Sequence, residues 1–431
     1  MNARRLFTRP LNIGHSLVIG HWPLVILFCA LAMSSPAANT GLIQFQNINT
    51  AFGLSLWQGE SLWTDNERDV AKRLAWPEES RTATLASYRL YPKKEMTVLG
   101  AHPQSLALYA ENGKVAQISM VFANRGDRAS KSEMENDAKA IEAALKPVLG
   151  EPVQAYFGQT KKIRYKVKRW NWKNHAILLE MPPETYVGVR IMPLEMADHE
   201  GRSEGIISYG QLRDTLSQRV QRRSNGDVVV GEIPMVDQGP KGYCVPATWE
   251  RYLRYLGIQA DMYVLALAGQ TKIGGGTSAN LMLENVEALA RRNGRRFDQL
   301  TMSMTTPNLA KYIDKGFPLM WCIFVDMDLE KKITVRAKER AKVTDWNAWQ
   351  EQLKSARGMP KIGPRHIKSA SDGGNMEINN AHMRMITGYN AKTREVAISD
   401  SWGKFAEERW VTVEEADAMS QNASAFWNVR W

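Results

Sequence analysis

Alternating apolar and polar positions predict most of the strands in the first half of the chain. Six short runs between residues 39 and about 205 show either this alternation or a continuous apolar stretch. They read ASYRLYP, SLALYAE, VAQISMVFA, IRYKVKRW, AILLEMP and YVGVRIMP. Two further segments, ERDVAKRLAW and SEMENDAKAIEAALKPVLG, repeat apolar residues at helical spacing, and Gly150 is suited to end the second. This mixture predicts an accessory α+β domain over residues 39–205.

The pattern changes in the second half, where helices precede strands. Apolar periodicity predicts three helices, at about 244–256, 260–268 and 278–292. The predicted strands then read FPLMWCIFV, HMRMITGYN, EVAISDS, ERWVTV and AFWNVRW. Residues 328–378 interrupt these strands with a helix near DWNAWQEQLKSAR and a polar, glycine-rich loop, which indicates an insertion. Helices followed by an antiparallel sheet predict a separate α+β domain over residues 230–431.

Residues 206–229 have the pattern of a helical linker between these domains. Leu212, Leu216 and Val220 fall on one helical face, and QRRSNGD then breaks the pattern with a dibasic pair and a turn. An ordinary linker and a cleavage point between a propeptide and an enzyme both fit this segment.

The first 38 residues have the three regions of a secretory signal peptide. Three arginines precede a hydrophobic run at about residues 17–33, and Ser35 and Ala37 follow at the spacing that signal peptidase requires. We therefore expect export to the periplasm or the medium after removal of residues 1–38. An uncleaved N-terminal membrane anchor is the alternative, because the run is near the lower length limit for a membrane-spanning helix.

Composition fits a globular protein that needs no disulfide framework. The 431 residues are 44% hydrophobic and 23% charged, and they include only three cysteines. Cys29 lies in the N-terminal apolar run, and Cys322 lies in PLMWCIFV, where a cysteine behaves as a small buried apolar residue. A disulfide between Cys244 and Cys322 stays open as an alternative.

The net charge of +11 has one concentrated source, the segment KKIRYKVKRWNWK at residues 161–173. Basic residues alternate there with apolar ones, which predicts a strand with a basic face over residues 162–169. A solvated strand face and a contact with an anionic surface both fit, and no nucleic-acid partner is expected. His102, His175 and His199 show no metal-ligand spacing, so we expect them at the surface or in the core.

Cys244 is the first candidate for chemistry. It stands in VDQGPKGYCVPATWERYLRYLGI, at the first turn of a predicted amphipathic helix. Unpaired N–H groups and the helix dipole favour a thiolate at that position, and Lys241 adds positive charge. A buried structural cysteine would also fit this placement. The choice between a nucleophile and a structural residue therefore depends on whether suitable partner groups are present.

A base and an acid follow at suitable positions. Only His366 and His382 lie after Cys244; His366 is in a loop, whereas His382 opens a predicted strand. The next strand ends in ISDSWG, so a hairpin can bring Asp400 beside His382. Asp400 can then fix the imidazole tautomer, and the ring of Trp402 can keep water from that bond.

Gln238 completes the set as a donor to a developing oxyanion. The segment QGPKGY can fold back over the helix start, because glycine and proline favour a tight return. The side-chain amide of Gln238 and the backbone N–H of Cys244 would then point at the same oxygen.

The order Gln, Cys, His, Asp resembles that of papain-like cysteine peptidases over about residues 230–431. The resemblance rests on two motifs: Q-x5-C at a helix start, and a histidine followed by DSWG. The CVPAT and YLG pieces are more similar to the bacteriocin-processing, double-glycine leader peptidases, cysteine peptidase family thirty-nine, whose third member is Asp. The chain departs from that family: no glycine follows the cysteine, DSWG replaces Asp-Pro, and no transporter segments are fused.

This resemblance implies a papain-like C-terminal domain that hydrolyses a peptide or protein substrate without metal or cofactor. It also implies that Gly275 and Gly276 line the substrate cleft. We expect Trp402 to contact the substrate as well. A hinge at these glycines, with Thr277 as the N-cap of the next helix, is the alternative. A silent peptide-binding module and an amidase or acyltransferase on the same scaffold are the alternative functions.

Overall fold

The computed structural model describes residues 44–202, 208–240, 242–272, 276–354, 358–368, 377–421 and 426–429. The predicted signal peptide lies outside these residues. None of the helices within the described ranges combines the length and the apolar character that crossing a bilayer requires.

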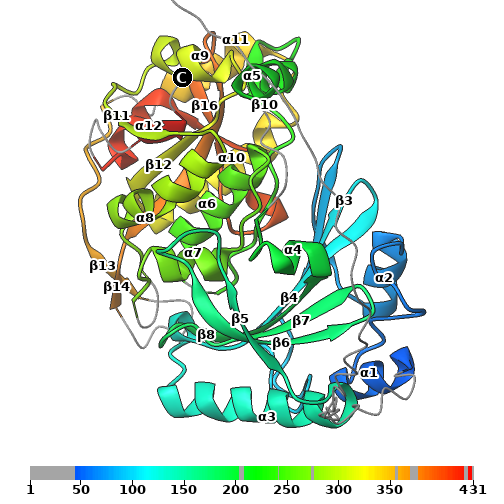
Figure 1. Cartoon of the computed structure of the whole chain (residues 1–431). Helices are drawn as coiled ribbons and strands as arrows, with labels where there is room; N and C mark the ends of the chain where they lie inside the picture. The colour runs from blue at the N-terminus through cyan, green and yellow to red at the C-terminus, as the bar shows by residue number, and fades with distance from the viewer. Residues whose placement is uncertain are drawn as a thin grey trace, which may run out of the picture. The chain divides into compact units, whose positions relative to one another are not determined.

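An eight-stranded antiparallel sheet organises the first half of the chain (Figure 1). Its spatial order is β1-β2-β3-β4-β8-β7-β6-β5. The bounds are β1 Glu78–Arg81, β2 Leu85–Leu90, β3 Ser105–Glu111, β4 Lys114–Asn124, β5 Val153–Phe157, β6 Tyr165–Trp172, β7 His175–Glu180 and β8 Tyr186–Pro193. All six predicted strands are present. The two additional strands, β1 and β5, form the edges, and their partly exposed sequences EESR and VQAYF lack a clear alternation.

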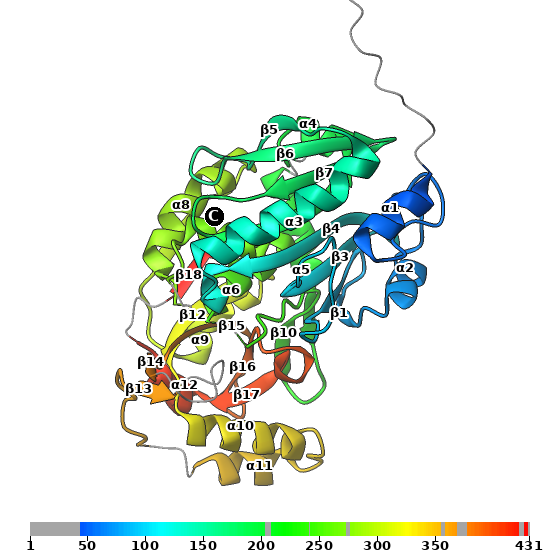
Figure 2. The same ribbon diagram turned by 90° about the horizontal axis from the view of Figure 1, so that it is seen from below.

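Helices cover one face of this first sheet. They are α1 (Phe45–Phe52), α2 (Glu67–Leu74) and α3 (Lys131–Leu149), and α3 runs along the sheet (Figure 2). Along β4, Ile118, Met120 and Phe122 join the core with these helices. Val121, which points to the other face, packs instead in a cluster with residues of the second half. The first sheet is therefore buried on both faces, because successive side chains of a strand alternate between them.

The connector is only partly helical. Helix α5 (Tyr209–Gln218) is followed by a hairpin of β9 (Val220–Arg222) and β10 (Asp227–Val230), so the helix predicted to continue to residue 229 ends at Gln218. The change has a local cause. Gly226 takes a positive φ of 90° in the turn, and the run Val228–Val230 is β-branched, which favours a strand.

A second sheet forms the centre of the C-terminal half, with the order β11-β18-β12-β15-β10-β9 and with β16 and β17 continuing from β15. Its strands include β11 Phe297–Leu300, β12 Leu319–Phe324, β15 Ala381–Asn390, β16 Glu395–Ser399, β17 Arg409–Thr412 and β18 Phe426–Val429. The helices are α6 Cys244–Tyr255, α7 Met262–Ala268, α8 Ala279–Arg292, α9 Thr306–Ile313 and α12 Val413–Met419. The three predicted helices and five predicted strands are all present.

The insertion contains two helices and a small hairpin. Helix α10 (Met327–Arg340) was not predicted, whereas α11 (Trp346–Leu353) was, and β13 (His366–Lys368) pairs with β14 (Glu377–Asn379). Arg340, at the end of α10, is buried and contacts Asp227 at 2.6 Å and Glu395 at 3.1 Å. The insertion is thus tied to the second sheet by buried ion pairs.

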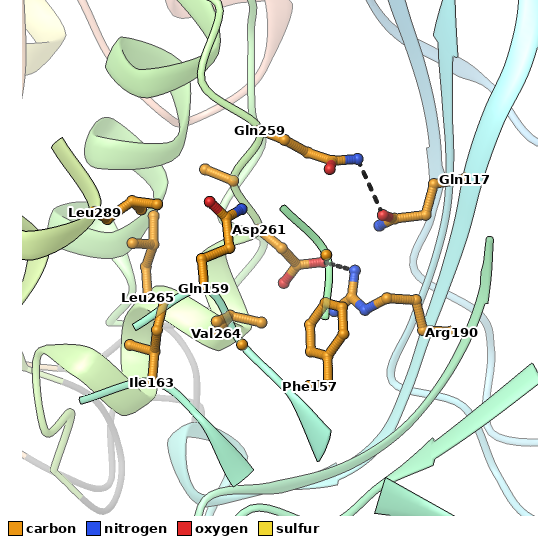
Figure 3. A pocket seen from close by; sticks show the side chains of 13 residues that line it. Gln117, Phe157, Gln159, Ile163, Arg190, Gln259, Asp261, Val264, Leu265 and Leu289 are labelled. Atoms are coloured by element: carbon orange, nitrogen blue, oxygen red, sulfur yellow. Dashed lines mark hydrogen bonds and ion pairs between the residues drawn. The ribbon is translucent and has the colours of Figure 1, made fainter. Parts of the chain in front are cut away.

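The two halves do not form separate bodies. Residues from Ile43 to Trp431 form one compact unit, so the predicted separate accessory domain is not confirmed. Buried polar contacts join the first sheet to α6 and α7: Tyr109 donates to Glu250 at 3.2 Å, and Ser119 donates to Asp261 at 2.9 Å. A crevice of about 40 Å³ lies at this boundary, and Arg190 is 3.4 Å from Asp261 there. Figure 3 shows the side chains that line it.

The basic strand has the predicted alternation, with Tyr165 and Val167 buried and Lys166 exposed between them. Three of its charges are partnered: Arg164 donates twice to Glu200, Lys168 lies 2.5 Å from Glu142, and Arg169 lies 2.7 Å from Asp198. These pairs lower the charge that the face presents to solvent. Contact with an anionic surface stays a prediction.

His175 is a core residue of the first sheet. Its Nε2 accepts hydrogen bonds from the Trp57 indole and the Leu62 backbone N–H, both at 3.1 Å. Its Nδ1 lies 3.2 Å from the Trp172 carbonyl, to which it donates. Burial of the ring lowers the pKa of His175 to about 4, although the bond to Trp172 opposes this shift.

This lowered pKa predicts an acid-sensitive step in stability. The unfolded chain binds a proton at His175 near its ordinary pKa, whereas the folded chain resists it, so the stabilisation is present above about pH 6.5 and is lost as the pH falls toward 4. We expect His175 to account for about 2–3 kcal/mol of lost unfolding free energy between about pH 7 and pH 4.5. Urea denaturation of wild type and His175→Gln at several pH values measures this change in the free energy of unfolding. Equal pH slopes for the two proteins would contradict the assignment.

Candidate active site

Helix α6 presents Cys244 at its first turn. Tyr243 is the N-cap residue and makes no side-chain cap, so the backbone N–H groups of the first turn are available to the thiol. The sulfur receives backbone hydrogen bonds from Val245 and from Met383 on β15. Cys244 is half-buried, which leaves it accessible from one side.

The two other predicted members of the triad lie in line with Cys244. His382 is at the start of β15, and its Nε2 lies 2.7 Å from Asp400 Oδ1, just after the end of β16. The adjacent pairing of β15 and β16 brings these residues together across 18 positions of sequence. The imidazole also hydrogen-bonds the Cys244 side chain. Because Asp400 engages Nε2, Nδ1 is the nitrogen available to the sulfur.

The electrostatics favour a thiolate–imidazolium pair. Burial alone would raise the pKa of Cys244, but the neighbouring His382 and the two backbone N–H groups lower it. Burial alone would lower the pKa of His382, but Cys244 and Asp400 raise it to about 9. Each partner therefore stabilises the charged form of the other, and the nucleophilic form of the cysteine is favoured near neutral pH.

Asp400 belongs to a buried cluster of four charges that the sequence did not reveal. Arg384 Nε lies 3.0 Å from Asp400 Oδ1, and Arg409 Nη2 lies 2.6 Å from Oδ2. Glu330, from helix α10 of the insertion, joins both guanidinium groups at 2.7 and 3.0 Å. Although burial would raise the pKa of Asp400, these cations and His382 hold it well below its usual range. Asp400 therefore stays ionised behind the imidazole.

Trp402 covers the histidine. Its ring stacks on the His382 imidazole with centroids 4.7 Å apart and planes inclined by 28°. The guanidinium carbons of Arg384 and Arg409 lie 5.5 and 5.4 Å from the same ring. Trp402 is therefore placed to exclude water from the His382–Asp400 bond, as expected. Its predicted contact with substrate stays a prediction.

Gln238 is anchored to the strand that carries the acid. Its backbone N–H donates to the Ser401 carbonyl at 2.8 Å, and the Ser401 hydroxyl donates to its side-chain Oε1 at 2.7 Å. This second bond orients the amide, because it assigns the oxygen to Ser401 and turns the nitrogen away from it. The buried Gln238 thus has a defined amide orientation, as an oxyanion donor requires.

A cavity of about 520 Å³ opens in front of the sulfur. Its lining includes Gly242, Cys244, Gly276, Cys322, Ala381 and His382. Gly276 is thus at the predicted cleft, whereas Gly275 lies outside the described residues. The N-cap of α8 is Ser278 and not the predicted Thr277, which lines the cavity instead.

Cys322 is also at this cavity and is not in a disulfide with Cys244, since both are free cysteines. Cys322 is 6% exposed and belongs to the apolar core cluster. Burial, with a smaller contribution from Cys244, raises the pKa of its thiol, which makes it a poor nucleophile. The prediction of a small buried residue in a strand is confirmed.

One signal for the charge cluster is present in the sequence and was not recognised. His382 and Arg384 stand two residues apart in a strand, so they share a face, and an arginine in an otherwise apolar strand needs a buried partner. Glu330 has no comparable signal, because it lies 54 residues away on a helix of the insertion. Within the described ranges, no group of three or more His, Cys, Asp or Glu residues is suited to a metal ion.

Comparison with known proteins gives one match. Residues 230–430 match the model of the Peptidase_C39 like family, which supports a C39-type, papain-like cysteine peptidase family for this part of the chain. The match does not extend to the bacteriocin-processing branch in particular. No curated protein and no solved structure matches the chain.

The thiolate–imidazolium pair predicts the pH dependence of alkylation. At about pH 6 an ordinary thiol is ionised to well under about 1%, whereas Cys244, whose pKa is lowered by His382 and by two backbone N–H groups, should have a larger thiolate fraction. We expect iodoacetamide to label Cys244 at least about tenfold faster in the wild type than in His382→Ala at that pH. Mass spectrometry of the Cys244 peptide measures both rates, and Cys322→Ala serves as the control. Equal rates in wild type and His382→Ala would exclude the ion pair.

Removal of the Glu330 carboxylate should destabilise the protein through the charge cluster. Glu330→Gln leaves two buried guanidinium groups with Asp400 alone, and loss of a buried charge partner costs about 3 kcal/mol. Chemical denaturation measures this loss. Asp328→Asn, on the exposed side of the same helix, is the matched control and should change stability by less than about 0.5 kcal/mol. A similar small change in both variants would show that the cluster does not stabilise the fold.

Proposed function

We propose that this protein is a cysteine peptidase that hydrolyses peptide bonds through Cys244, His382 and Asp400, with Gln238 as the oxyanion donor. The observation that carries the proposal is the hydrogen-bonded line of sulfur, imidazole and carboxylate at the edge of a 520 Å³ cavity. The family match over residues 230–430 supports the same chemistry.

The reaction follows from the charges of the pair. The Cys244 thiolate attacks the peptide carbonyl carbon, and the electron pair of the C=O bond moves to oxygen. The Gln238 amide and the Cys244 N–H then stabilise the oxyanion. Protonated His382 gives a proton to the leaving amine, so the C–N bond breaks and a thioester remains. His382 next accepts a proton from water, which attacks the thioester and releases the acid and the thiolate.

Asp400 and its arginines have a supporting role in this reaction. A fixed negative charge behind His382 stabilises the imidazolium that forms during each cycle and holds Nδ1 toward the sulfur. Since Arg384 and Arg409 keep the carboxylate ionised, the acid does not take the proton itself. Trp402 limits the access of water that would weaken this bond.

The alternatives differ in what they require of the site. A silent peptide-binding module does not need a nucleophile with a lowered pKa next to a paired histidine, which disfavours it. An amidase or acyltransferase would use the same groups on another acyl donor or acceptor. Assays with peptides and with small amides separate these two activities.

We also propose that the enzyme acts outside the cytoplasm after removal of residues 1–38. The arginines, the apolar run and the small residues of that segment support export. The substrate is then a peptide or protein of the periplasm or the medium, and contact with an anionic surface through residues 162–169 is a further part of this proposal.

A fluorogenic peptide library tests the activity. We expect the wild type to hydrolyse a subset of peptides and Cys244→Ala to hydrolyse none. Gln238→Ala should lower kcat by about 10²- to 10³-fold with little change in KM, because the amide acts mainly on the oxyanion. Cys322→Ala should keep activity. Hydrolysis that persists in Cys244→Ala would refute the nucleophile, and aminolysis without hydrolysis would indicate an acyltransferase.

A further inference from the structure

The loop that leads into Cys244 is held largely by the first sheet. We name residues 235–240 and 242–243 the approach loop; it carries Gln238 and ends at the N-cap of α6. Its contacts with the first half of the chain are buried or half-buried hydrogen bonds at both of its ends.

At the first end, three groups of the first sheet bond the loop backbone. Ser80 accepts from the Met235 N–H and Glu79 accepts from the Asp237 N–H, each at 2.8 Å. The Tyr91 hydroxyl donates to the Asp237 carbonyl at 2.5 Å. The backbone N–H and the backbone carbonyl of Asp237, which directly precedes Gln238, are therefore both held by groups of the first half of the chain.

Glu79 and Tyr91 are themselves rigidly placed. Glu79 accepts from Arg89 at 2.6 Å and from Ser87 at 2.9 Å, so its carboxylate cannot reorient without losing these bonds. The ring of Tyr91 packs against Gly239, where a Cβ would lie 2.8 Å from the ring and where φ is +65°. A side chain at Gly239 would therefore displace the approach loop.

At the second end, the first half holds the residue next to the nucleophile. Tyr243 is 1% exposed, and its hydroxyl donates to Asn124 Oδ1 at 2.9 Å. Its ring lies against Gly126 so closely that a Cβ there would be 2.3 Å from it. The position of the α6 N-terminus is thus set by the loop after β4.

The first half does not occupy the cleft. The cavity in front of the Cys244 sulfur is lined, among the described residues, only by residues from Gly242 to Gln421 of the sequence. The dibasic pair of the connector is also tied to the second half, since Arg222 contacts Asp314 at 3.1 Å and Arg223 contacts Glu408 at 2.6 Å. An inhibitory propeptide would cover the nucleophile, whereas the described residues of the first half leave the cavity at Cys244 unoccupied.

We propose that Tyr91 and Tyr243, through their bonds across the boundary between the halves, are positioning residues for the oxyanion donor and the nucleophile. The first sheet is then a permanent part of the active site, and catalysis requires both halves of the chain. This inference rests on the proposed function, because it concerns the transition state of that hydrolysis. It deepens that function by assigning a task to residues 78–193.

Three hydroxyl deletions in the full chain test the inference. Tyr91→Phe removes the bond to the Asp237 carbonyl, and Tyr243→Phe removes the bonds of that hydroxyl to Asn124 and to the Gly126 backbone N–H; both variants keep the ring. Tyr109→Phe is the matched control, because its hydroxyl bonds Glu250 across the same boundary and contacts no residue of the loop; its other partner is Arg89, which keeps its own bond to Glu79. We expect kcat to fall about 3- to 10-fold in each test variant and less than about 2-fold in the control, with KM unchanged in all three.

Two further readouts separate positioning from a general loss of structure. Iodoacetamide labelling of Cys244 at about pH 6 needs the ion pair and no oxyanion donor, so Tyr91→Phe should label at the wild-type rate. Hydrogen exchange at the amides of residues 235–243 should be faster in both test variants than in the control. Wild-type kcat in both test variants, or an equal fall in Tyr109→Phe, would overturn the inference.

The exchange measurement also distinguishes the two proposals. A wild-type protein with a reactive Cys244 and no amide hydrolysis would refute the proposed function. Exchange that stays unchanged in Tyr91→Phe and Tyr243→Phe would refute the role of the hydroxyls in holding the loop, whatever the activity of the wild type.

Discussion

A buried carboxylate that must stay ionised is the constraint on which the candidate site depends. Asp400 can stabilise a protonated His382 only as an anion, yet full burial disfavours an anion. Arg384 and Arg409 resolve this conflict by direct contact. Their two positive charges need more than one carboxylate for neutrality, and Glu330 provides the second.

That constraint explains why an insertion between two strands is part of the site. Helix α10 leaves the sheet after β12 and returns Glu330 to the arginines behind the triad. The same helix ends in Arg340, which pairs with Asp227 and Glu395 in the second sheet. Two sets of buried ion pairs therefore hold α10 in place. A segment that the sequence indicated as an insertion carries half of the negative charge of the cluster.

The first sheet meets the C-terminal half through polar and aromatic groups. One of its faces packs on α1, α2 and α3 with apolar residues, whereas the other presents Tyr109, Ser119 and Arg190 to α6 and α7. Buried hydrogen bonds demand defined geometry, so such a boundary fixes orientation more tightly than apolar contact alone. This fits a boundary that has to place the approach loop beside the nucleophile.

The sequence by itself determined the local elements and the candidates for the reacting groups. Periodicity located the main helices and strands of both halves, and the spacing of Gln238, Cys244, His382 and Asp400 indicated acyl-transfer chemistry. These features are local or rest on adjacent strands, as with the pairing of β15 and β16. The same reasoning missed β1 and β5, whose edge positions leave little hydrophobic pattern, and it extended the connector helix past a glycine turn.

Only the tertiary structure decided which distant groups support the reacting ones. Glu330 lies 54 residues before Arg384, and Tyr91 lies 146 residues before the carbonyl that it holds. Neither contact follows from periodicity, because a hydrogen bond between remote segments depends on how whole sheets and helices pack. For the same reason, two domains that looked separate in the sequence proved to share a buried polar boundary. The order of residues in the sequence indicated the chemistry. Three-dimensional packing decided which groups keep the candidate residues charged and in place.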